Sequence, residues 1–106
     1  PAIFKKGNMY WMITSGCTGW IPNEARMFSA SSIWGPWEQY PNPCRGQNSE
    51  KTFGGQSTFV LELSENRFIF MADVWKPKSL MYSGHIWLPI QFDEKGIPFI
   101  EWLDKW

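Results

Sequence analysis

The sequence predicts an all-β protein built from about two four-stranded antiparallel units. Short runs of Tyr, Trp, Phe, Ile, Val and Thr alternate with Gly, Pro, Asn and Ser clusters, and no long segment keeps a helical period. Residues 8–15 (NMYWMITS) are echoed about 58 residues later by residues 66–73 (NRFIFMAD). A repeat of this length made of several short strands is typical of β-propeller blades. Because two blades cannot close a propeller, we expect the chain to be part of a larger domain.

The strand signals follow the same order in both units. Each unit begins with a hairpin, continues through a Trp-bearing loop (Trp20, Trp75) to further strand-like residues, and closes on a Gly-Pro or Gly-x-Pro turn. Residues 40–55 are rich in Pro, Asn, Gly and Ser and are interpreted as the connection between units. The predicted units are residues 1–45 and 46–106. The predicted hairpins join residues 2–4 to 10–13, 58–63 to 67–71, and 87–92 to 98–102.

Composition excludes several classes of partner. Ten acidic residues balance ten basic ones and no basic run occurs, so neither nucleic acid nor a membrane surface is an expected partner. Eight Trp, eight Phe and three Tyr suit either a β core or a surface that stacks on sugar rings. One His and two separated Cys give no zinc-ligand spacing, so we expect no metal and no cofactor.

The cysteines and the start of the chain leave alternatives open. Cys17 and Cys44 are compatible with one disulfide in an oxidising compartment or with two buried thiols. The chain starts at Pro1 with strand-like residues and without an initiator Met or a signal-peptide pattern. This pattern favours a start inside a longer protein over removal of a leader.

Two glycine-bearing segments are candidates for a site. In Ser15–Trp20 (SGCTGW), two glycines bracket a Cys-Thr pair, so Thr18 and Trp20 could contact a ligand; an ordinary turn with a buried Cys is equally compatible. In Thr52–Thr58 (TFGGQST), Gln56 could face a pocket, although a hydrogen-bonded turn is the favoured interpretation from composition alone. The second segment matches neither a phosphate loop nor a nucleophile elbow.

A third candidate is Asp73, which falls where Ser15 falls in the first copy, just before Trp75. Its carboxylate could touch a substrate, but capping of backbone amides is the favoured interpretation. Glycoside hydrolysis needs an acid and a base, and composition singles out no other acidic residue for either role. His85 is interpreted as structural.

Taken together, these segments resemble glycoside hydrolase family 43, with the greatest similarity to its galactan β-1,3-galactosidase-like branch. The resemblance covers essentially the whole chain. The blocks that carry it are residues 1–5 (PAIFK), 10–20 (YWMITSGCTGW), 32–37 (SIWGPW), 42–44 (NPC), 53–58 (FGGQST), 87–90 (WLPI) and 101–102 (EW).

The resemblance implies a five-bladed β-propeller that hydrolyses glycosidic bonds with inversion, of which this chain would be the C-terminal two blades. It places the general-acid Glu just before Pro1, outside the chain, so the isolated chain is expected to be inactive. Gln56 matches the position proposed for the missing base, Thr18 matches a substrate-contacting position, and Asp73 and Trp75 match a pocket-facing strand end and loop. Where relatives read Gly-Ser-Gln and Gly-Asp-Arg-Trp, this chain has Gly54-Gly55-Gln56 and Ala72-Asp73-Val74-Trp75.

The expected parent is a secreted or periplasmic enzyme that acts on a plant-type polysaccharide. The first expectation is β-1,3-galactan, followed by related galactosides, arabinosides or xylosides. The expected partners are this saccharide and the remaining blades, or a second copy of the chain through an exposed blade face. The alternative function is a non-catalytic carbohydrate-binding or interaction module, with Trp20 and Trp75 as stacking platforms.

Overall fold

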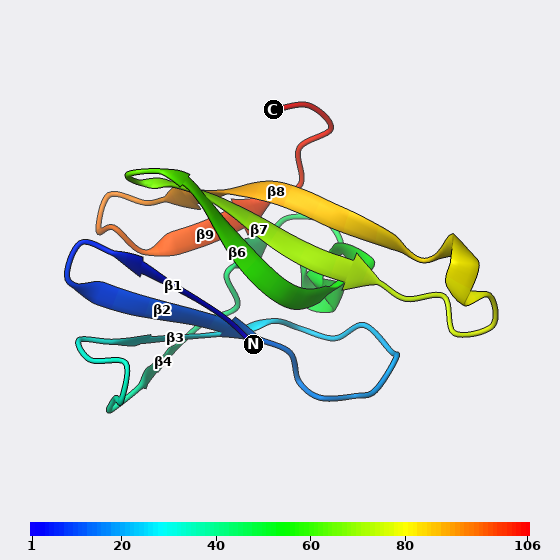
Figure 1. Ribbon diagram of the computed structural model, residues 1–106, viewed down its shortest axis with the longest axis horizontal. Helices are drawn as coiled ribbons and strands as arrows, with labels where there is room; N and C mark the ends of the chain where they lie inside the picture. The colour runs from blue at the N-terminus through cyan, green and yellow to red at the C-terminus, as the bar shows by residue number, and fades with distance from the viewer.

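The computed structural model describes all 106 residues and contains strands and two short 3₁₀ segments, which confirms the all-β prediction. The strands form two sheets (Figure 1). None of the helical segments has the length and apolar character needed to cross a lipid bilayer. The elements are β1 (Ala2–Lys6), β2 (Met9–Thr14), β3 (Arg26–Ala30), β4 (Glu38–Tyr40), β5 (Cys44–Arg45), η1 (Ser49–Gly54), β6 (Gln56–Ser64), β7 (Arg67–Val74), η2 (Leu80–Tyr82), β8 (Gly84–Phe92) and β9 (Pro98–Glu101).

The first sheet is an antiparallel meander in the order β1-β2-β3-β4. Its first hairpin turns at Gly7 and Asn8, and Gly7 has a φ of 58°, a conformation that costs glycine little. The register pairs Phe4 with Trp11 and Trp11 with Ser29. Paired residues on neighbouring strands share a face, so these side chains all point toward the second sheet.

The second sheet has the order β5-β9-β8-β7-β6. Strands β6 to β9 form a meander equivalent to β1 to β4, and the two echoed segments supply the second strand of each meander, β2 and β7. Strand β5 differs from the expectation of two four-stranded units because it pairs parallel to β9, with Cys44 opposite Ile100. The last two residues of the range predicted for the first unit therefore join the second sheet.

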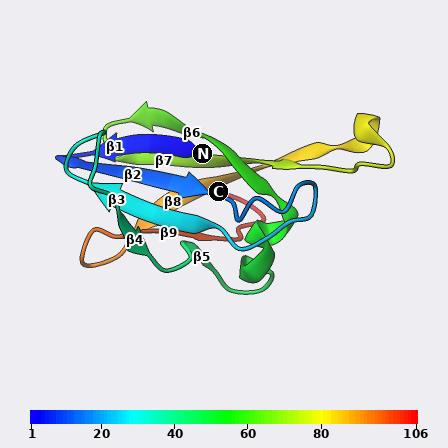
Figure 2. The same ribbon diagram turned by 90° about the horizontal axis from the view of Figure 1, so that it is seen from below.

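The two sheets pack face to face around one hydrophobic core (Figure 2). Every second side chain along a strand points inward, as strand geometry requires. Ile13 and Phe70 have no exposed surface. Phe4 and Phe68 meet across the sheets with ring centroids 5.0 Å apart. The core cluster includes Phe4, Trp11, Ile13, Met27, Cys44, Val60, Phe68, Phe70, Leu88 and Ile100.

The outer face of each sheet also carries a row of apolar side chains. On the second sheet, Phe59 and Trp87 both pair with Met71, and both are exposed. On the first sheet, Ile3 and Phe28 both pair with Met12. We call these two sets the outer apolar rows. They leave apolar surface in solvent on opposite sides of the molecule.

The cysteines are free thiols rather than a disulfide. Cys17 is exposed, which contradicts the alternative of two buried thiols, whereas Cys44 lies in the core. Burial in apolar surroundings, with a smaller contribution from the negative charge of Glu24, raises the pKa of the Cys44 thiol to about 12. Cys44 therefore behaves as a small apolar core group.

Candidate functional site

Three segments meet at one end of the two sheets and bring predicted site residues together. They are the β2–β3 loop, the start of β6 and the long β7–β8 hairpin, which projects to the right in Figure 1. The amide Nε2 of Gln56, the first residue of β6, donates to the carbonyl oxygen of Gly19 and, at 3.5 Å, to that of Ile21. Gln56 is thereby held against the loop that carries Thr18 and Trp20.

The β2–β3 loop is held by hydrogen bonds centred on Asn23. Its Oδ1 accepts from the backbone N–H of Gly16 (2.6 Å), and its Nδ2 donates to Thr18 Oγ1 (2.6 Å). The Thr18 hydroxyl in turn donates to the carbonyl oxygen of Ile21 (2.6 Å). The single hydroxyl proton of Thr18 is therefore used within the loop, and a ligand could reach only its remaining lone pair.

Residues on both sides of Gln56 are tied to the β2–β3 loop or to β2 itself. Buried Thr52 donates through its hydroxyl to the carbonyl oxygen of Asn23 (2.7 Å), and Ser57 donates to that of Ile13 (3.1 Å). Thr52 and Phe53 lie in the left-handed region, at φ values of 51° and 57°. Sequence reasoning missed Thr52 because its partner Asn23 lies 29 residues away, and it missed Asn23 because no motif marks its bonds within the loop.

Trp20 and Trp75 lie in loops that belong to different sheets, and they pack against each other. Their ring centroids lie 5.0 Å apart at an interplanar angle of 75°, an edge-to-face arrangement. Trp20 remains 53% exposed and Trp75 38%. The two predicted platforms thus form one aromatic wall beside Gln56, rather than two independent stacking surfaces.

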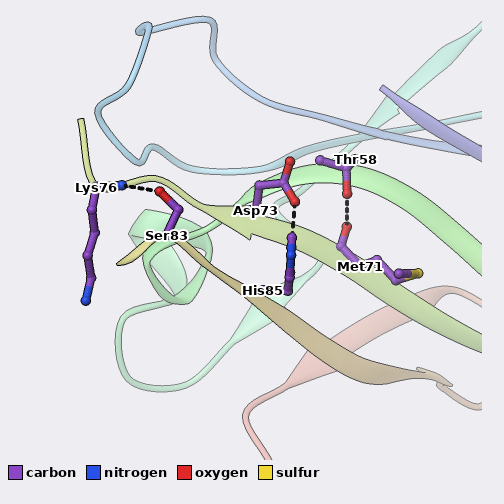
Figure 3. Close-up of polar contacts among 6 residues, drawn as sticks. All are labelled: Thr58, Met71, Asp73, Lys76, Ser83 and His85. Atoms are coloured by element: carbon purple, nitrogen blue, oxygen red, sulfur yellow. Dashed lines mark hydrogen bonds and ion pairs between the residues drawn. The ribbon is translucent and has the colours of Figure 1, made fainter. Parts of the chain in front are cut away.

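Asp73 and His85 form a polar pair on the outer face of the second sheet. Asp73 pairs in register with Gln56 on one side and with His85 on the other, so the three residues share a face. Asp73 Oδ1 lies 2.9 Å from His85 Nδ1 (Figure 3). The carboxylate therefore pairs with an imidazole, which contradicts the interpretation of Asp73 as a cap of backbone amides. Because the His85 side chain is 70% exposed, solvent reaches this pair.

Further bonds in this region hold the strands and the hairpin. Thr58 Oγ1 donates to the carbonyl oxygen of Met71 (3.1 Å) across β6 and β7, and the backbone N–H of Lys76 donates to Ser83 Oγ (3.0 Å), which closes the base of the β7–β8 hairpin (Figure 3). No group of three His, Cys, Asp or Glu side chains in the chain could hold a metal ion. The site therefore offers an amide, one carboxylate–imidazole pair and an aromatic wall.

Comparison with known proteins finds similar chains among solved structures. No protein-family model and no curated protein matches the chain. A family 43 β-1,3-galactosidase solved with galactodeoxynojirimycin is 64% identical, with a TM-score of 0.97, and the chain is covered completely. A second family 43 β-1,3-galactosidase is 40% identical, with a TM-score of 0.91, again over the whole chain. An exo-β-1,3-galactanase from Phanerochaete chrysosporium, solved with β-1,3-galactotriose, is 38% identical over 94% of the chain, with a TM-score of 0.82.

The chain corresponds to a part of each of these proteins. It spans 31%, 23% and 22% of their respective chains. Within that part the match includes both sheets and the end where Gln56 meets the aromatic wall, because it runs the full length of the chain for the first two proteins. On this similarity, the chain belongs to glycoside hydrolase family 43 and resembles the β-1,3-galactosidases of that family.

Proposed function

We propose that the chain forms two blades of a five-bladed β-propeller, the remaining blades being supplied by other parts of a longer protein. The two equivalent meanders packed face to face support this proposal, as does the limited share of the relatives' length that the chain spans. The outer apolar rows supply a further argument. Neighbouring blades on both sides would remove these rows from water, which the isolated chain cannot do.

The complete protein would hydrolyse terminal β-1,3-linked galactosides with inversion of configuration. The observation that carries this proposal is the 64% identity, over the whole chain, to a β-1,3-galactosidase solved with a galactose-like inhibitor. Inversion requires a carboxylic acid to protonate the leaving oxygen while a second group directs water to the opposite face of the sugar. The acid would lie outside this chain, and Gln56 would direct the water.

The geometry of Gln56 favours orientation of water over proton abstraction. Its amide nitrogen donates to the carbonyl oxygen of Gly19 and lies 3.5 Å from that of Ile21, so the NH₂ group faces two backbone acceptors. The side chain is thereby held as the ordinary amide, with Oε1 free to accept a hydrogen bond from water. A water fixed in this way would present a lone pair to the anomeric carbon and, on attack, would release its proton to neighbouring solvent. The aromatic wall of Trp20 and Trp75 would border the sugar.

Hydrolysis of β-1,3-galactan by the full-length protein tests this function, with NMR used to follow the anomer released first. We expect α-galactose as the first product and a loss of about 10²-fold or more in kcat for Gln56→Ala. Gln91→Ala is the matched control, since Gln91 lies near the end of β8 that is farther from the candidate site. If full-length wild-type protein binds galactotriose without hydrolysing it, the activity is refuted and the alternative of a carbohydrate-binding module is favoured.

We further propose that the parent protein is secreted or periplasmic. A polymeric galactan is too large to enter a cell before it is cut, so an enzyme that acts on its chain ends must meet it outside the cytoplasm. Fractionation of the producing cells, followed by detection of the protein, tests this localisation. Recovery of the protein only from the cytoplasm would contradict it.

A further inference from the structure

An open cavity lies at the outer edge of the second sheet, away from Gln56. Its volume is about 530 Å³, and it lies between η1, β5 and the residues that follow β9. We call it the edge pocket. Side chains of three chemical kinds line it, namely aromatic, amide and charged. They belong to Phe53, Trp102, Gln47, Asn48, Arg45 and Glu101.

Trp102 and Phe53 form the aromatic part of the edge pocket. Their ring centroids are 5.9 Å apart and their planes are inclined by 55°. The Trp102 indole Nε1 donates to Asp104 Oδ1 (2.9 Å), which fixes the ring, and the residue remains 52% exposed. A fixed, half-exposed indole beside open space suits the apolar C–H face of a sugar ring.

The charges of the edge pocket favour a neutral ligand. Arg45 and Glu101 are register partners in the β5–β9 pair, so one positive and one negative side chain adjoin the same space. The Arg45 guanidinium also lies 3.9 Å from the centroid of the Phe99 ring and 3.8 Å from Asp93 Oδ2. With its charge engaged in this way, Arg45 does not make the pocket an anion site. Hydroxyl groups, in contrast, suit the amides of Gln47 and Asn48.

The topology places the edge pocket at the same end of the sheet as the Gln56 site. Strands β7 and β9 both run antiparallel to β8, so Trp75 after β7 and Trp102 after β9 follow strand ends on the same side. Gln56 begins β6, three strand positions from β9 in the sheet order, which is roughly 15 Å across the sheet. Only a saccharide of several units could therefore occupy both places.

We propose that the edge pocket is an accessory saccharide site, which holds a distant part of a β-1,3-galactan chain while its end is cut at the Gln56 site. The choice of sugar rests on the proposed function. Segment η1 links the two places, because Phe53 lines the edge pocket while Thr52 is bonded to the β2–β3 loop. The pocket would raise the affinity for polymer without touching the bond that is broken.

The test compares a long and a short substrate in the full-length protein. Trp102→Ala should raise KM for polymeric β-1,3-galactan by about threefold to tenfold and leave kcat and KM for a chromogenic β-galactoside unchanged. Gln47→Ala should act in the same direction, and it keeps the test valid if Trp102→Ala fails to fold. The matched control is Trp34→Ala, since Trp34 is 92% exposed on the β3–β4 loop and lies outside both sites.

Each outcome decides for or against the accessory site. Equal losses on both substrates would show that Trp102 acts through the fold or the Gln56 site and would overturn the proposal, as would no loss on either. If the wild-type protein cleaves neither substrate, the proposed function fails separately. Titration with β-1,3-galactotriose, followed by NMR of the Trp102 indole N–H signal, then still tests the pocket. Saccharide binding there is supported if this signal shifts in the wild-type protein and not in Gln47→Ala. It is refuted if the signal does not shift in the wild type, or shifts equally in both proteins.

Discussion

Gly55, the residue before Gln56, allows a test of how closely the start of β6 packs against β7 and β8. A Cβ built at this position would lie 3.0 Å from Ala72 Cβ and 3.1 Å from Ile86 Cδ1, against ordinary contacts of 3.4–4 Å. Ala72 and Ile86 are register partners on β7 and β8. The φ of Gly55 is −109°, which any residue can adopt, so Gly55→Ala is opposed by packing alone.

The expected cost follows from which neighbour can move. The Ile86 Cδ1 is the end of a flexible side chain, but Ala72 Cβ is fixed to the backbone of β7, so the strands themselves must separate. Overpacking of this kind costs about 1–3 kcal/mol, and the reduced entropy of the unfolded chain returns about 0.4–1 kcal/mol. We expect Gly55→Ala to lower the free energy of unfolding by roughly 1–2 kcal/mol.

Urea unfolding of the full-length protein, followed by tryptophan fluorescence, measures this change. The matched control is Gly84→Ala at the start of β8, where an added Cβ meets nothing within 4 Å. That variant should be as stable as the wild type, or more stable by up to about 1 kcal/mol. Adding Ile86→Val to Gly55→Ala should recover part of the loss in a double-mutant cycle. The reasoning is refuted if the Gly55 and Gly84 variants are equally stable.

Three further predictions concern the isolated chain, its thiols and the aromatic wall. The purified 106-residue chain should self-associate through the outer apolar rows and release no galactose, as followed by light scattering and sugar analysis; an active, soluble monomer would contradict this. At pH 8, iodoacetamide should label Cys17 but not Cys44, because a pKa of about 12 and burial keep Cys44 a protected thiol; equal labelling by mass spectrometry would refute that assignment. Trp75→Ala should weaken galactotriose binding to the full-length protein by about threefold to tenfold in calorimetry, and unchanged affinity would exclude the wall from the site.

Local patterns in the sequence were sufficient for most of the strands. Aromatic and β-branched residues in alternation predict the three hairpins, and Asn66, with a φ of 65°, occupies a turn of the kind that Asn tolerates. The repeat correctly identified two equivalent meanders. Strand β5 escaped prediction because it has two residues, and its partner β9 lies more than fifty residues away.

The sequence was sufficient to name the residues of the candidate site, but it did not predict how they are arranged. Pairing of Asp73 with His85 depends on the register between β7 and β8, and the Trp20–Trp75 contact depends on how the two sheets dock. The left-handed Thr52 and Phe53 oppose their own backbone preferences, so no local rule predicts them. The roles of Gln56, Thr18 and the two tryptophans in catalysis and binding stay predictions.

The hydrogen bonds at the start of β6 have a consequence for the order of folding. The bonds from Thr52 to Asn23, from Ser57 to Ile13 and from Gln56 to Gly19 join residues 29, 44 and 37 positions apart. Contacts with such long sequence separation form only after loop closure, and therefore later than the hairpins. Either sheet can assemble its own hairpins first, but Gln56 acquires its final orientation only when both sheets have docked. A nascent chain would thus remain without a finished site until both sheets have been synthesised and have docked.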